Sequence, residues 1–180
     1  MTVYVALLRG INVGGKHSLP MQELRNILGA LGCEDVRTYI QSGNAVFRSV
    51  DDRESLAAKI KSAIEQAFGF APHVHVLTIE EFQSILAANP FPEAVATPKL
   101  LHVSFLAETP ENPDLEALES VRSGTERFEL HANAFYLHAP DGIGRSKLAA
   151  KVERCLGVAT TARNWRTVNK IAELAATIIS

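Results

Sequence analysis

The hydrophobic positions of this chain alternate between short apolar runs and stretches with helical spacing. Residues 3–9 form an apolar run of strand length that stops at Gly10. Apolar residues then recur every three or four positions between residues 21 and 31, which is typical of an amphipathic helix. By the same criteria the first half contains a strand over 3–9, a helix over 21–31, strands over 36–41 and 44–49, a helix over 56–68 and a strand over 73–77.

The second half repeats this order after a break in the chain. Thr78 and Glu81 have the spacing of a capping box and predict a third helix, which ends before the Pro-rich segment 89–99. The elements predicted beyond it are a strand over 100–107, a short helix over 112–121, strands over 126–131 and 134–139, a helix over 148–156, a short strand over 158–161 and a final helix over 164–178.

A β-α-β-β-α-β order is the signature of a ferredoxin-like unit. We therefore predict an α+β fold built from duplicated ferredoxin-like units, each with a four-stranded antiparallel sheet, plus an extra C-terminal helix. The predicted division is residues 1–88 for the first unit with its trailing helix, 89–99 for a Pro-rich linker, and 100–180 for the second unit with the C-terminal helix.

Composition places the chain among ordinary globular proteins. Of its 180 residues 47% are hydrophobic and 21% are charged, which argues against disorder and against a coiled coil. No apolar stretch approaches the length of a membrane span, the N-terminus has no leader-like segment, and Cys33 and Cys155 stand alone. These features favour a protein of the reducing cytoplasm with no membrane partner; they leave the oligomeric state open.

The charge is distributed unevenly although the total is only -2. Residues 1–50 carry five basic and three acidic side chains, residues 51–121 carry four and twelve, and residues 122–180 carry nine and five. Since local potential rather than total charge attracts an anion, the two basic segments are where an anionic ligand is expected.

A Gly-rich loop follows the first predicted strand, at residues 10–17. It matches the G-x-x-x-x-G-K pattern of a phosphate-binding P-loop, but His17 stands where Ser or Thr must hold magnesium. Ferredoxin-like topology brings this loop to the same end of the sheet as the hairpin after residue 41. The first candidate anion site therefore consists of Arg9, Asn12, Gly14, Gly15, Lys16, Gln41, Ser42 and Asn44. The alternative is a turn and a hairpin with no ligand.

A second Gly-rich basic loop lies in the C-terminal third, where it is predicted to open a helix. Its candidate residues are Asp141, Gly144, Arg145, Ser146 and Lys147, and farther along Arg163, Asn164 and Trp165. The only tryptophan stands between two arginines, an arrangement that suits either stacking on a ring or docking of the last helix on the core.

Four segments together resemble a known bacterial family. They are Ala6–Lys16 (ALLRGINVGGK), Tyr39–Asn44 (YIQSGN), Pro140–Leu148 (PDGIGRSKL) and Thr160–Trp165 (TTARNW). This sequence is similar to the family catalogued as domain of unknown function 1697, with Thr160-Thr161 as a small departure from its usual Gly-Thr. The resemblance covers essentially the whole chain and implies a duplicated ferredoxin-like α+β fold. It implies no activity, substrate or catalytic residue.

Three functions are compatible with these motifs. The leading hypothesis is the binding of a phosphorylated small molecule or nucleotide through the Gly-rich basic loops. The second is an RNA- or DNA-binding module, although the aromatic signature of RNA-recognition sheets is missing. The third is an enzyme acting on a phosphorylated or acyl substrate with Lys16, His17 or Ser42 as reacting groups. The histidine spacing does not match a metal site, and no cofactor is predicted.

Overall fold

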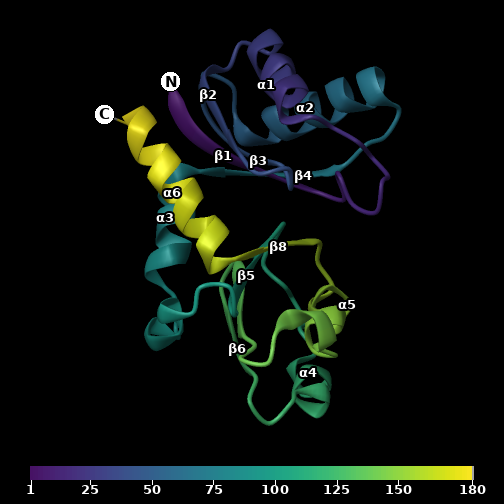
Figure 1. The fold of residues 1–180 in the computed structure, drawn as a ribbon, viewed down its shortest axis with the longest axis vertical. Helices are drawn as coiled ribbons and strands as arrows, with labels where there is room; N and C mark the ends of the chain where they lie inside the picture. The colour runs from purple at the N-terminus through teal and green to yellow at the C-terminus, as the bar shows by residue number, and fades with distance from the viewer. Residues whose placement is uncertain (180) are drawn as a thin grey trace. The chain divides into compact units, whose positions relative to one another are not determined.

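The computed structural model describes residues 1–179 and divides into two compact units (Figure 1). The first unit comprises Met1–Ser84 together with the chain from Asn169 onward, and the second comprises Ile85–Val168. Ser180, the last residue of the predicted second unit, lies outside the described residues. Each unit is a four-stranded antiparallel sheet with helices, so the α+β fold predicted from the sequence is confirmed.

The first unit has the strand order β2-β3-β1-β4, in which every neighbouring pair is antiparallel. This is the order of a ferredoxin-like sheet, because the first two strands run parallel on either side of the third. Its elements are β1 (Thr2–Arg9), α1 (Met21–Ala30), β2 (Glu34–Tyr39), β3 (Asn44–Ser49), α2 (Arg53–Phe68), β4 (His73–Thr78) and α3 (Ile79–Ala87), which continues into the second unit.

The core of the first unit lies between the sheet and helices α1 and α2, which cover the same face (Figure 1). Alternate residues of β1, namely Tyr4, Ala6 and Leu8, enter this core because successive side chains of a strand point to opposite faces. The intervening Val5 and Leu7 are also fully buried. The central strand is therefore covered on both sides, which explains why its sequence is a continuous apolar run rather than an alternating one.

The second unit repeats the arrangement with the strand order β6-β7-β5-β8. Its core side chains come from the sheet and from two short helices, with Leu118, Leu148 and Leu156 among them. Its elements are a 3₁₀ helix (Pro92–Ala96), β5 (Leu101–Leu106), α4 (Leu115–Val121), β6 (Arg127–His131), β7 (Ala134–His138), 3₁₀ turns at Ile143–Arg145 and Ala149–Lys151, α5 (Val152–Leu156), β8 (Thr160–Asn164) and the start of α6 (Trp165–Ile179).

Several helix ends follow local sequence rules. At the start of α3 the Thr78 amide donates to the Glu81 carboxylate at 2.9 Å, and the Glu81 amide donates to the Thr78 hydroxyl at 3.2 Å. This is the capping box that the spacing predicts. At the start of α6 the Asn164 side chain accepts from the amide of Thr167 at 2.9 Å, so Asn164 caps the final helix.

The division into units differs from the predicted one in the C-terminal helix. Val168, Ile171, Ala175 and Ile178 are buried on one face of α6, and the part of the helix from Asn169 onward groups with the first unit. Arg48 on β3 donates to the backbone carbonyl of Ile178, which ties the end of α6 to the first sheet. The segment 89–99 also differs from a plain linker, because it contains a 3₁₀ helix and the buried side chains of Phe91 and Ala94.

Candidate functional site

The first Gly-rich loop folds into a miniature hairpin. Val13 and Lys16 form an antiparallel bridge, with the Lys16 amide donating to the Val13 carbonyl at 3.0 Å. Gly14 and Gly15 make the turn, and both have positive φ, 58° and 72°, a pair of conformations that favours glycine. Lys16 lies four residues ahead of Pro20, which caps α1 without a side-chain hydrogen bond. A P-loop lysine begins its helix, so this loop is not a P-loop.

Asn12 clamps this hairpin to the neighbouring turn. Its side-chain amide donates to the carbonyls of Leu19 at 2.9 Å and Gln41 at 2.7 Å, and its oxygen accepts from the amide of Leu19 at 2.8 Å. The loop after β1 and the turn after β2 therefore lie together, as the topology predicted. All three hydrogen bonds connect the Asn12 side chain to backbone groups of Leu19 and Gln41. Asn12 therefore has a structural role.

Replacing Asn12 by alanine is expected to lower the free energy of unfolding by about 2–4 kcal/mol, since it leaves the three backbone groups without their partner and places alanine at φ 53°. Urea unfolding followed by circular dichroism measures the change. The matched control is Asn26→Ala on the exposed face of α1, for which a change within about 0.5 kcal/mol is expected. Equal effects of the two substitutions would contradict the clamp.

The turn after β2 is held by Asn44, a buried residue. Its side chain donates to the Tyr39 carbonyl at 3.0 Å and to the Ser42 hydroxyl at 2.9 Å. Ile40 has a φ of 48°, which is unusual for a β-branched residue, and Gly43 has a φ of 83°. Of the residues predicted for the first site, Arg9, Lys16 and Gln41 are exposed, whereas Asn12 and Asn44 hold the two loops in place.

The second Gly-rich loop does not open a helix, so that expectation is wrong. Residues 143–145 and 149–151 form 3₁₀ turns, and α5 begins only at Val152. Glycine has a low helix propensity, and Gly142 takes a φ of 91° that an α-helix excludes. The loop is held by two side chains: Asp141 accepts from the Thr125 hydroxyl at 2.5 Å, and Ser146 accepts from the Ala149 amide at 3.0 Å. Gly144, Arg145 and Lys147 remain exposed.

Three segments of the second unit leave its sheet at one end. Leu101 at the start of β5 pairs with His138 at the end of β7, and His102 pairs with Asn164 at the end of β8. The chain before β5, the Gly-rich loop after β7 and the start of α6 therefore share this end. The basic residues of these three segments are Lys99, Arg145, Lys147 and Arg166, and we call this region the basic end of the second sheet. The start of β6 lies at the same end, and there Arg127 forms an ion pair with Glu93.

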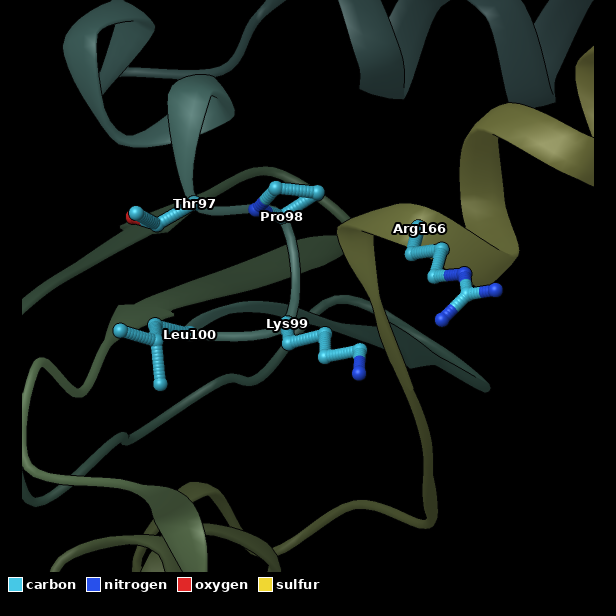
Figure 2. A pocket seen from close by; sticks show the side chains of 5 residues that line it. All are labelled: Thr97, Pro98, Lys99, Leu100 and Arg166. Carbon is cyan, nitrogen blue, oxygen red and sulfur yellow. The ribbon is translucent and has the colours of Figure 1, made fainter.

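A pocket of about 470 Å³ lies at the basic end, lined by Thr97, Pro98, Lys99, Leu100 and Arg166. Two backbone hydrogen bonds build it: the Ala139 amide donates to the Leu100 carbonyl at 2.9 Å, and the Arg166 amide donates to the Pro98 carbonyl at 3.3 Å. Figure 2 shows the Lys99 and Arg166 side chains extending to the same side of this segment, with Leu100 directed the other way. The surface that lines the pocket is almost entirely apolar, so Lys99 and Arg166 contribute mainly carbon atoms to its wall and their charged ends lie beside it.

Within residues 1–179 the four cations of the basic end form no ion pair, although Asp141 lies in the same loop as Arg145 and Lys147. At least six other arginines and lysines of the described chain do form ion pairs. The N-terminus of α6, a helix of 15 residues, adds the positive end of its dipole beside Arg166. This arrangement can hold a negatively charged group.

The other predicted residues of the C-terminal third are largely covered. Trp165 is 6% exposed and contributes to the core, so it docks the last helix and offers no open ring for stacking. Burial lowers the pKa of Arg163 to about 10. Arg163 follows Thr161 on the same face of β8, since alternate residues of a strand share a face.

The histidines form no metal site among the described residues, where no group of three potential ligands lies close enough to hold an ion. His73 and His75, two residues apart on β4, share a face of the strand, with ring centroids 6.5 Å apart. His131 and His138, which stand on the two strands of one hairpin, are not cross-strand neighbours. Their partners in the hairpin are Ala134 and Arg127, at its opposite ends.

Lys99 and His102 are the residues at this end that the sequence did not point to. Lys99 stands in the Pro-rich segment and His102 inside an apolar strand, and neither belongs to a glycine or basic motif. The only available signal was a basic residue directly before a strand. Arg166 follows a predicted site residue, Trp165, and the basic residues around that tryptophan were its signal.

Comparison with known proteins supplies a family but no activity. No helix of the described chain is both long and apolar enough to cross a membrane. A search of curated proteins finds no match. Among solved structures, a conserved bacterial protein, SP0830 from Streptococcus pneumoniae, matches with a TM-score of 0.71 and 30% sequence identity, over 97% of this chain and 98% of that one. The profile of the family described as protein of unknown function (DUF1697) matches residues 1–136, and the chain belongs to that family.

Proposed function

We propose that this protein binds a phosphorylated small molecule or a nucleotide at the basic end of the second sheet. The observation that carries the proposal is an apolar pocket of about 470 Å³ whose wall includes Lys99 and Arg166, two cations that form no ion pair in residues 1–179. The volume falls in the range of small-molecule sites, roughly 300–1,000 Å³. A phosphate group supplies the negative charge that these side chains lack.

The second Gly-rich loop supports this assignment. Arg145 and Lys147 are exposed on it, and it leaves the sheet at the same end as the pocket segment. A ligand with more than one phosphate would extend from the pocket toward this loop. The first Gly-rich loop offers less, because its hairpin uses the amides of Asn12, Lys16 and Leu19 in internal hydrogen bonds.

The burial of the second sheet favours a small ligand over RNA. RNA-recognition sheets expose aromatic side chains on an open face. In β5 every residue is buried, and in β7 only His138 is partly accessible, so these two strands present no open face for stacked bases. A compact pocket at the end of the sheet is better matched to a small molecule.

Binding is tested by titrating the full chain with inorganic phosphate, pyrophosphate and nucleoside mono- and triphosphates, with isothermal calorimetry as the readout. Lys99→Gln and Arg166→Gln are each expected to weaken binding roughly tenfold, the loss of one charge-assisted hydrogen bond. Lys61→Gln on the exposed face of α2 is the matched control and leaves affinity unchanged. Failure of every probe to bind contradicts the proposal, and so does affinity that depends on Lys16 but not on Lys99 or Arg166.

A further inference from the structure

The pocket at the basic end has an apolar wall because the polar groups of the segment that forms it are engaged within the chain. The Thr97 amide donates to the Ala94 carbonyl at 3.1 Å, and the Leu100 amide donates to the Thr97 carbonyl at 2.9 Å. The Thr97 hydroxyl donates to the Ala94 carbonyl at 3.5 Å. The carbonyls of Pro98 and Leu100 accept the two backbone hydrogen bonds described above, and proline has no amide hydrogen to offer.

This hydrogen bonding limits what the pocket can hold. A nucleoside carries several hydroxyl, amine and ring-nitrogen groups, and in this pocket most of them would lose water without gaining a partner. Burying an unpaired polar group costs free energy, whereas moving a hydrocarbon group out of water into an apolar pocket is favourable. The pocket is therefore matched to a hydrocarbon group rather than to a nucleoside.

Lys99 and Arg166 give the pocket its second property. Their carbon atoms belong to the apolar wall, and their side chains extend to the same side of the segment (Figure 2). Long basic side chains commonly cover apolar surface with their methylenes while the charged end stays in water. Neither cation forms an ion pair within residues 1–179, so the hydrocarbon-lined pocket has two available positive charges beside it.

We propose that the ligand of this pocket is an amphiphilic phosphate: a hydrocarbon group that lies in the pocket and ends in a phosphate held by Lys99 and Arg166. This assignment rests on the proposed function and narrows its ligand class, because it selects a phosphorylated apolar molecule over a nucleotide. Each part of such a ligand meets a matching part of the site, the hydrocarbon group the apolar wall and the phosphate the two cations.

The test is a chain-length series measured by isothermal calorimetry on the full chain, with inorganic phosphate, methyl phosphate, butyl phosphate, hexyl phosphate and the four common nucleoside monophosphates. Affinity is expected to rise roughly two- to fourfold for each added methylene, the upper value being that of full burial. The heat-capacity change of binding is expected to become more negative along the series, since more apolar surface is buried. The nucleoside monophosphates are expected to bind no more tightly than methyl phosphate.

Two substitutions of the exposed Lys99 separate its charge from its carbon atoms. Lys99→Met keeps an apolar side chain without the charge, and is expected to weaken every phosphate by the same factor, roughly tenfold, with the gain per methylene unchanged. Lys99→Ala also removes most of the carbon atoms, so it is expected to reduce the gain per methylene. Lys61→Met and Lys61→Ala, on the exposed face of α2, are the matched controls and change neither quantity.

Three results would overturn the inference: hexyl phosphate binding no more tightly than methyl phosphate, a nucleoside monophosphate binding more tightly than hexyl phosphate, or Lys99→Ala leaving the gain per methylene unchanged. In each case the proposed function stands as long as the phosphates bind and depend on Lys99 and Arg166. If no phosphate-bearing molecule binds, the proposed function fails and this inference fails with it.

Discussion

Replacing Gly43 by alanine is expected to lower the free energy of unfolding by about 3 kcal/mol or more, the largest effect expected among the glycine-to-alanine substitutions. A Cβ at this position would lie 2.7 Å from Cβ of Leu8 and 2.7 Å from Cδ1 of Ile11. Leu8 is fully buried in the central strand and Ile11 is 2% exposed, so neither atom has room to move away. The φ of 83° adds backbone strain for any residue with a side chain.

The effect of Gly43→Ala is measured by urea unfolding. Two other glycine substitutions, measured in the same way, separate the steric contact from the backbone strain. Gly14→Ala meets no atom within 4 Å but has a φ of 58°, so it is expected to cost only the backbone strain, about 1–2 kcal/mol. Gly29→Ala lies in α1 with open space around it and is expected to stabilise the protein by about 0.5–1 kcal/mol. If Gly43→Ala costs no more than Gly14→Ala, the close approach of the hairpin to β1 is not rigid.

Acid is expected to destabilise this protein between pH 6.5 and pH 4 through two buried histidines. Burial lowers the pKa of His75 and of His102 to about 4, and the nearby His73 contributes to the shift at His75. Between these pH values the unfolded chain binds protons at both rings and the folded chain does not. Stability therefore falls as the pH falls, by up to about 3 kcal/mol for each histidine over the full interval.

Urea unfolding at pH 7, 5.5 and 4.5 measures this dependence. His75→Gln and His102→Gln are each expected to flatten the decline, since glutamine does not titrate, even where the substitution lowers stability at pH 7. His131→Gln, at the exposed end of the β6–β7 hairpin, is the control for the procedure. A decline of the same steepness in the double variant His75→Gln/His102→Gln would assign it to other groups.

The element order could be predicted because each signal is local. Thr78 and Glu81 are three residues apart and form the predicted capping box within one helical turn. The turn between β2 and β3, at residues 40–43, and the apolar run of β1 likewise depend on neighbours in the chain. Once two β-α-β-β-α-β orders are present, the ferredoxin-like topology places the Asn12 loop beside the turn at Gln41, and the hydrogen bond between them confirms that placement.

The second Gly-rich loop could not be predicted in the same way. The apolar spacing of Leu148, Val152 and Leu156 indicates a helix. All three side chains are buried in the same core, although the backbone there is a 3₁₀ turn followed by a five-residue helix. One hydrogen bond from a distant residue, from the Thr125 hydroxyl to Asp141, and one local bond, from the Ala149 amide to Ser146, hold the irregular segment. Periodicity reports which side chains are buried, not whether the backbone between them is continuous helix.

By itself, the sequence determined the number and order of the strands, the family, and the two basic segments, since each depends on residues close together in the chain or on the motifs as a set. Only the tertiary structure decided which basic residues lie at the same end of a sheet. Lys99, Arg145 and Arg166 come from three distant segments, and only the antiparallel register of β5 with β7 and β8 brings them to one end of a sheet. The pocket exists because of that register, which no local pattern encodes.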